Sequence, residues 1–158
     1  MLAAIRPDDW NFPLLLHVLG ASLLLGALIT AVTAQLLAWK RPAPADVVPY
    51  ARFSFRTLLF VAIPAWFLMR IAGEWIASRE NWNDVDELPS WLDLGYVIGD
   101  LSGPLLLIAV ILAGIGSRRL GQSNGERGAT LVRVATVLSV LLVIAYVIAV
   151  WAMSAQPD

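Results

Sequence analysis

The sequence has no cysteine and only one histidine among its 158 residues. Without cysteine, the chain cannot form a disulfide, a thiolate metal site or a cysteine nucleophile. A single histidine cannot build a three-histidine zinc site, and it cannot supply both axial ligands of a bis-histidine haem within one subunit. We therefore predict no metal site built from side chains.

The sequence does contain several long hydrophobic segments. Hydrophobic residues make up 59% of the chain, and the mean hydropathy of +0.73 is far above that of an ordinary soluble domain. A helix needs roughly 20 mainly apolar residues to cross a bilayer, and four such runs nearly exhaust the chain. We predict an all-α fold, an integral membrane four-helix bundle in which residues 1–158 form a single transmembrane domain. The predicted helices cover about 12–39, 55–77, 94–116 and 131–153.

The charges between these runs predict the orientation. Basic residues gather in the first and third loops, whereas the second loop, 78–93, is mainly acidic and could hold a short helix on the membrane surface. Because basic loops stay in the cytoplasm, both termini should be extracytoplasmic in a multi-pass protein of a bacterial cytoplasmic membrane. A cleaved signal peptide over residues 1–34 is the alternative, but its positive charge would precede the apolar run. The basic loop residues are Lys40, Arg41, Arg52, Arg56, Arg118, Arg119 and Arg127.

Small residues at four-residue spacing mark two candidate helix contacts. Membrane helices associate through close backbone approach, which small side chains permit. The third run carries Gly95, Gly99 and Gly103, and the first carries Ser22 and Gly26. These stripes predict tight packing, either within the chain or between two copies in a homodimer. The lipid bilayer is the expected partner, with a homodimer or larger membrane complex also open, and we expect no nucleic acid.

Polar residues from all four predicted helices fall at a similar depth below the outer membrane face. The ionisable ones lie ~5–10 Å below the outer helix ends at 1.5 Å per residue. Such groups are costly in a membrane and usually face the bundle interior or a water-filled cavity. They predict a polar site that opens outward, or else a neutralised ion-pair network that ties the helices together. The residues are His17, Arg70, Glu74, Asp100 and Tyr146.

The single histidine raises the question of a cofactor. His17 and Met69 could be the two axial ligands of a haem b, while a five-coordinate porphyrin site or one histidine from each subunit of a dimer stays open. A hydrogen-bonded structural histidine is the alternative. A metal site formed by His17 with Glu74 and Asp100 lacks any spacing signature.

The run Leu16-His17-Val18-Leu19-Gly20-Ala21, with small residues continuing to Gly26, resembles the opening of a group of four-helix bacterial membrane proteins. This group includes copper-resistance D-like proteins and the membrane protoporphyrinogen oxidase of haem synthesis. The resemblance covers one helix and the helix count, and it implies a haem-handling role for His17. The further basic residues expected of the oxidase and the methionine and histidine richness expected of copper transport are both missing. The resemblance therefore favours a separate branch of the group.

Two classes of function follow. In the first, the chain is a haem- or porphyrin-binding or redox module, with His17 as ligand or proton donor and Arg70 pairing a propionate or another anionic group. In the second, it is a non-catalytic bundle or accessory subunit whose polar cluster fixes helix packing. A small-solute transporter is a weaker third alternative, because no continuous polar path leads from His17 to the inner face.

Overall fold

The computed structural model describes residues 8–40, 44–82, 85, 87–122 and 125–156, and these residues form helices joined by short turns. No strand occurs among them, so the predicted all-α fold is confirmed. Four helical stretches are long and apolar enough to cross a membrane, as the hydropathy of the sequence predicts. The chain is accordingly a multi-pass membrane protein. The four stretches are Phe12–Trp39, Asp46–Arg79, Ser90–Leu120 and Gly125–Ala155.

The helices extend beyond the apolar runs from which they were predicted. The second begins at Pro44 rather than near residue 55, because proline is tolerated in a first turn, where its missing N–H would have no partner. The other helices likewise continue into polar turns that a hydropathy pattern does not register. The elements are α1 (Asp8–Trp39), α2 (Pro44–Thr57), η1 (Leu58–Ala62), α3 (Ile63–Arg79), α4 (Ser90–Leu120) and α5 (Gly125–Ala155).

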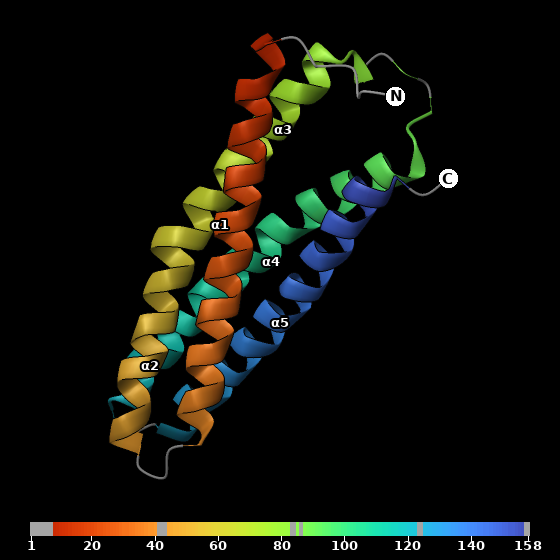
Figure 1. Ribbon diagram of the computed structural model, residues 1–158. Coiled ribbons are helices and arrows are strands. Elements are labelled where there is room, and N and C mark those ends of the chain that lie inside the picture. The colour runs from red at the N-terminus through yellow and green to blue at the C-terminus, as the bar shows by residue number, and fades with distance from the viewer. Residues whose placement is uncertain (1–7, 41–43, 83–84, 86, 123–124, 157–158) are drawn as a thin grey trace.

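The second span is a continuous rod made of α2, η1 and α3 (Figure 1). The π-helix η1 is explained by the proline that follows it. Pro64 has no N–H to donate to the carbonyl of Phe60, and the N–H of Ile63 bonds to the carbonyl of Leu58 in the wider π pattern. The chain thus accommodates Pro64 by a π-helical turn. Pro104 lies inside α4, where it removes the bond to the Asp100 carbonyl.

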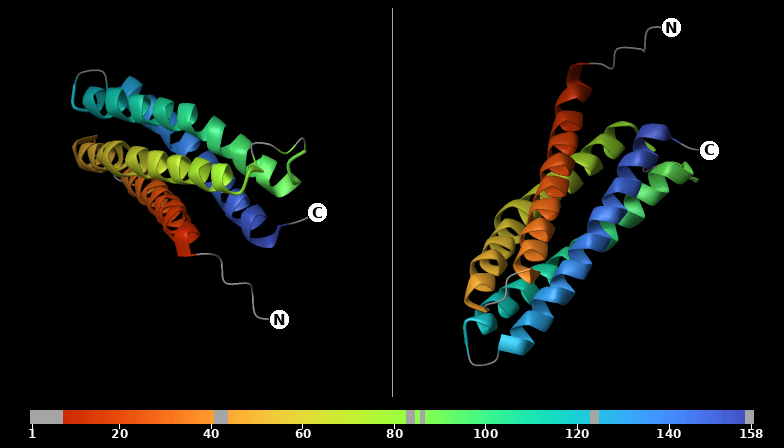
Figure 2. Two further views of the ribbon diagram at one scale, coloured as in Figure 1. Left: turned by 90° about the horizontal axis from the view of Figure 1, so that it is seen from above. Right: turned by 60° about the horizontal axis from the view of Figure 1, so that its bottom comes forward.

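The bundle consists of two antiparallel associations. α4 and α5 lie side by side along their length, while α1 packs against α2, η1 and α3 (Figures 1 and 2). The start of α1, the end of α3 and the end of α5 lie at one end of the molecule, which we call the terminal end. The opposite end, where the exposed basic residues gather, is called the basic end. Trp82, between Arg79 and Ser90, has a 3₁₀ conformation, and the predicted short surface helix otherwise falls in part on residues 83, 84 and 86, which lie outside the described residues.

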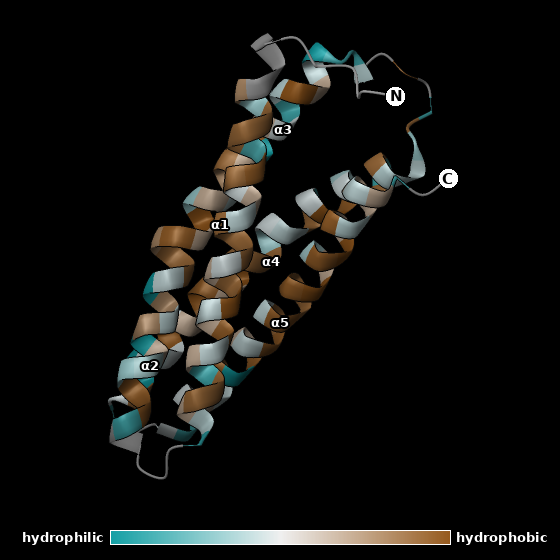
Figure 3. Cartoon of the chain, in the orientation of Figure 1, coloured by the Kyte–Doolittle hydropathy of each residue, from teal (hydrophilic) through white to brown (hydrophobic). Residues whose placement is uncertain are grey.

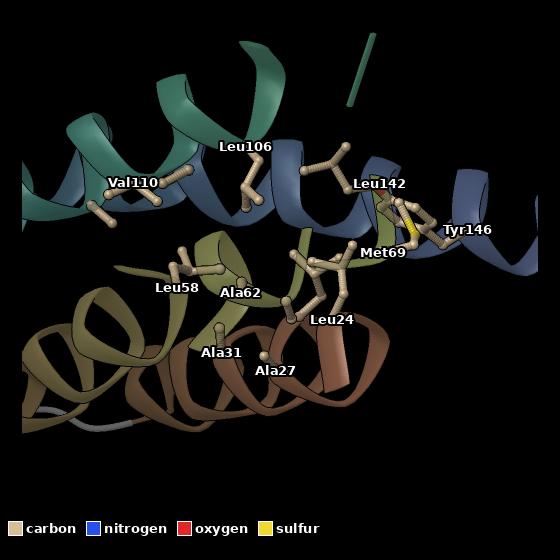
Figure 4. Close-up of a cluster of buried hydrophobic side chains, with 14 residues drawn as sticks. Leu24, Ala27, Ala31, Leu58, Ala62, Met69, Leu106, Val110, Leu142 and Tyr146 are labelled. Carbon is tan, nitrogen blue, oxygen red and sulfur yellow. The ribbon is translucent and has the colours of Figure 1, made fainter. Parts of the chain in front are cut away.

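The core is built from small side chains, and the large ones point away from it. Alanine is the commonest buried hydrophobic residue, alongside a few leucines such as Leu24, Leu58 and Leu106 (Figure 4). Phe60 and Ile71, by contrast, are 69% and 65% exposed. In the view of Figure 3, hydrophobic residues predominate along the four spans, and most hydrophilic residues lie near the two ends. This distribution is expected when lipid, rather than water, surrounds the bundle.

The small-residue stripe predicted on α1 does not contact another helix. Ser22 and Gly26 are exposed, and a Cβ added to Gly26 would have no neighbour within 4 Å. The close contact is made instead by Gly20, whose added Cβ would lie 2.6 Å from the backbone nitrogen of Met69 on α3. The prediction of Ser22 and Gly26 as intramolecular packing positions was wrong, because the stripe lies on the other face of the helix.

The stripe on α4 does lie inside the bundle. A Cβ on Gly95 would collide with the end of Met153 on α5, and one on Gly103 would lie 2.5 Å from the Trp66 ring of α3. Gly99 is buried beside the aliphatic part of Arg70. These glycines therefore make room for large side chains of α3 and α5.

Candidate functional site

An ion cluster joins α3 to α4 in the terminal half of the bundle. Arg70 and Glu74 lie one turn apart on α3 and form an ion pair. The same guanidinium reaches α4, where its Nη2 and Nε lie 2.7 and 3.0 Å from Oδ1 of Asp100. The Tyr96 ring, one turn before Asp100, lies 5.3 Å from the Arg70 Cζ. The structure thus brings together three of the predicted polar residues and adds Tyr96.

The cluster carries one positive and two negative charges. The Arg70 side chain is 25% exposed, whereas those of Glu74 and Asp100 are 46% and 60% exposed. Nε, Nη1 and Nη2 of the guanidinium already donate to carboxylates. One further N–H remains on each of Nη1 and Nη2, but the two carboxylates make the cluster negative overall, so the arrangement suits a clamp between helices better than an anion site.

His17 bonds to the backbone of α3 and not to the ion cluster. Its Nδ1 lies 2.9 Å from the Met69 carbonyl oxygen. A carbonyl can only accept, so Nδ1 carries the proton and Nε2 of the neutral ring keeps its lone pair. Gly73 makes this contact possible, because an added Cβ there would lie 3.1 Å from Nδ1. Histidines that ligate metals are commonly oriented through such a bond.

The Met69 side chain belongs to the apolar core. It is 7% exposed and lies in the cluster that contains Leu24, Leu142 and Tyr146 (Figure 4). The backbone of the same residue holds the His17 ring. An axial pair of His17 and Met69 on opposite faces of a haem would require this packing to open, so the second predicted ligand does not fit. A single ligand, His17, is compatible with the structure.

Tyr146 takes part in a separate hydrogen-bond network. Its hydroxyl lies 2.5 Å from Ser102 Oγ, which in turn donates to the Gly99 carbonyl at 2.9 Å. Tyr146 is therefore the donor to Ser102. Trp66 Nε1 also donates to Ser102 Oγ, at 3.1 Å. The network joins α3, α4 and α5 one turn below the ion cluster.

A third polar cluster lies in the basic half of the bundle and was not predicted as a site. Gln35 of α1 is fully buried, and its Nε2 donates to Ser54 Oγ of α2 at 2.5 Å. The Thr136 hydroxyl of α5 is the donor to the Gln35 carbonyl oxygen. The signal in the sequence was a lone glutamine within a strongly apolar run. Its amide both donates and accepts, so it can link two partner helices at once.

The described residues contain no group of three histidine, aspartate or glutamate side chains arranged to hold a metal ion. No protein-family model, curated protein or solved structure matches this chain. The resemblance to the copper-resistance D and protoporphyrinogen oxidase group stays a prediction. Function must therefore be argued from the three polar clusters and from the charges at the two ends.

Proposed function

We propose that the chain resides in a bacterial cytoplasmic membrane with both termini on the extracytoplasmic side. Exposed basic residues at the basic end support this orientation, because such residues are retained in the cytoplasm. A reporter enzyme that is active only outside the cytoplasm should be active when it is fused after Asp158. Activity of a cytoplasmic reporter at the same position would show the opposite topology. The basic residues are Lys40, Arg52, Arg56, Arg118, Arg119, Arg127 and Arg133.

Within that membrane, the protein acts as a non-catalytic bundle or accessory subunit whose polar clusters hold the helices together. The observation that supports this most directly is the state of Arg70, which is paired with carboxylates of both its own helix and α4. The described part of the chain also contains no buried side-chain nitrogen or oxygen without a hydrogen-bond partner. Polar groups that await a ligand are usually less completely satisfied than this.

A double-mutant cycle tests the structural role of the cluster. Arg70→Gln, Asp100→Asn and the double variant would be unfolded from detergent micelles with increasing dodecyl sulfate. We expect each single variant to be less stable and the coupling to be about 0.6 kcal/mol, the average for interhelical contacts in membranes. Functional polar groups often oppose stability, so a more stable Arg70→Gln variant would contradict the structural role.

Glu74→Gln is the matched control for this cycle. It alters the other ion pair of Arg70, which lies within one helix and is worth about 0.3–0.5 kcal/mol. The coupling free energy between Arg70 and Glu74 should therefore not exceed the coupling free energy between Arg70 and Asp100. A larger coupling for Glu74 would contradict the interpretation that the contact between the two helices is the main stabilising contact of Arg70.

A porphyrin-binding module is the second candidate, and the geometry of His17 supports it. The bond from Nδ1 to the Met69 carbonyl fixes the tautomer that leaves Nε2 able to ligate iron. Such a site would be five-coordinate, because Met69 lies in the core. The proposed Arg70–propionate pair loses support, since the guanidinium already lies between two carboxylates whose negative charge would repel a propionate.

Absorption spectra distinguish the two candidates. The purified protein would be titrated with haem in detergent, and oxidised and reduced spectra would be recorded beside a His17→Ala variant. A Soret band that requires His17 supports the porphyrin module. Equal spectra for both proteins, or no saturable binding, favour the non-catalytic bundle. Thr30→Ala, on the outward face of the same helix, is the control for nonspecific effects.

A small-solute transporter has less support. A layer of leucines separates the Tyr146 network from the Gln35 cluster, and each of these leucines is at most 2% exposed. Apolar packing of this kind leaves no polar lining for a solute to follow through the bundle. The layer consists of Leu24, Leu28, Leu58, Leu106 and Leu142.

A further inference from the structure

A groove of about 500 Å³ lies between α1 and α2, near the basic end and on the outer surface of the bundle. It exists because α1 presents the small side chains of Thr33 and Ala34 opposite the larger Tyr50 and Phe53 of α2. The hydroxyl of Thr30, at the same groove, bonds to the Gly26 carbonyl of its own helix at 2.7 Å. The groove thus offers a mainly apolar lining.

The dimensions of the groove suit one lipid chain. It extends along α1 from Ile29 to Leu37, or ~12 Å at 1.5 Å per residue. One leaflet contributes about half of the roughly 30 Å hydrocarbon thickness. Thr33, Leu37 and Phe53 are exposed, so the groove is open to the surrounding lipid.

Basic side chains flank the groove on both helices. Lys40 follows the groove at the end of α1, and its backbone N–H bonds to the carbonyl of Leu37. Arg56 lies one turn beyond Phe53 on the same face of α2. Because α2 runs antiparallel to α1, Arg56 lies deeper in the membrane than Lys40, close to the level of Thr33. Both residues are exposed, and long basic side chains extend readily to the headgroup level. A positively charged rim favours an anionic headgroup over a zwitterionic one.

We propose that this groove binds an acyl chain of a phospholipid whose anionic headgroup is held by Lys40 and Arg56. The small residues of α1 determine where the chain lies. The two cations determine which lipid is selected. The site lies in the opposite half of the bundle from the ion cluster of Arg70, and it does not depend on either candidate function.

Native mass spectrometry of the full chain released from detergent tests the proposal. Phosphatidylglycerol and phosphatidylcholine with identical acyl chains would be added at equal concentrations. Each basic residue should increase the binding of an anionic lipid about fivefold. Depending on whether one or both cations contact the headgroup, we expect a preference for phosphatidylglycerol of about 5- to 25-fold. Thr33→Trp should fill the groove and abolish the preference, with Thr33→Leu as a milder variant. Val137→Trp, on the exposed face of α5, should leave it unchanged.

The charge requirement has its own comparison. Replacing Lys40 and Arg56 by glutamine should reduce retention of phosphatidylglycerol to that of phosphatidylcholine, whereas replacing Arg118 and Arg119 should not. Thermal unfolding in detergent would establish that every variant is folded. Equal retention of the two lipids, or equal losses in the two double variants, would overturn the proposal. So would a lipid-free dimer that Thr33→Trp dissociates, because the occupant would then be a second copy.

Discussion

Two glycines of α1 offer a direct comparison of packed and open helix faces. A Cβ on Gly20 would lie 2.6 and 2.9 Å from the backbone N and Cα of Met69, and 3.0 Å from the Ala65 carbonyl oxygen. These are main-chain atoms of α3, which cannot rotate away as a side chain can. A Cβ on Gly26 would meet nothing within 4 Å. Gly20→Ala and Gly26→Ala therefore add the same methyl group to opposite environments.

The expected difference can be estimated from these distances. Ordinary Cβ contacts begin at 3.4 Å, so α1 must move away from α3 by 3.4 − 2.6 = 0.8 Å to admit a methyl group at Gly20. Overpacking of this kind costs about 1–3 kcal/mol. Alanine regains at most about 1 kcal/mol of helix propensity at either position. The free energy of unfolding of Gly20→Ala should thus be about 2 kcal/mol lower than that of Gly26→Ala.

The assay is reversible unfolding from dodecylmaltoside micelles with increasing dodecyl sulfate, followed by far-ultraviolet circular dichroism. The free energies of unfolding of both variants are compared with that of the unmodified chain. Gly20→Ala should be the least stable of the three. If Gly20→Ala were as stable as Gly26→Ala, the close approach of α1 to α3 would be refuted.

Two further substitutions test the buried hydrogen bonds by the same titration. Gln35→Met removes the bonds to Ser54 and Thr136 at similar side-chain volume, and at about 0.6 kcal/mol for each bond the loss should be about 1 kcal/mol. An unchanged midpoint would show that Gln35 does not link the helices. Tyr146→Phe removes only the bond to Ser102, so about half that loss is expected, and a loss larger than that of Gln35→Met would contradict the assignment of a single bond.

The number and type of the helices could be predicted from the sequence because lipid imposes a simple requirement. An apolar run must be long enough to cross the bilayer, and every backbone group inside it must be satisfied by helix formation. The helix ends were less predictable, since polar turns continue the same hydrogen-bond pattern outside the hydrocarbon. The early start of α2 at Pro44 is the largest such difference.

The polar residues were located by depth, but their partners depend on helix rotation. Arg70 and Glu74 share a face of one helix, so their pairing follows from the i, i+4 spacing. Depth alone did not show that His17 would bond to the backbone of α3, or that Tyr146 would bond to Ser102. In a span that is apolar on every side, the sequence has no polar face that fixes its rotation.

The same difficulty explains the error at Gly26. Two small residues on α1 looked equivalent in sequence, yet Gly20 faces α3 and Gly26 faces outward. Spacing identifies a stripe on a helix but does not say which neighbour it meets. Gln35 was not predicted as a site for a related reason, since one glutamine near a membrane boundary is also compatible with contact to the backbone or to headgroups.

The contrast between a core of alanines and an outer layer of large apolar residues has a practical consequence for redesign. The contacts that hold the helices together are short-range and internal, so the outer layer serves mainly to match the solvent. Exchanging exposed residues such as Phe60, Ile71 and Leu101 for charged helix formers would change that solvent from lipid to water. The buried alanines, glycines and hydrogen bonds would be left as they are. The protein is thus suited to conversion into a water-soluble four-helix bundle.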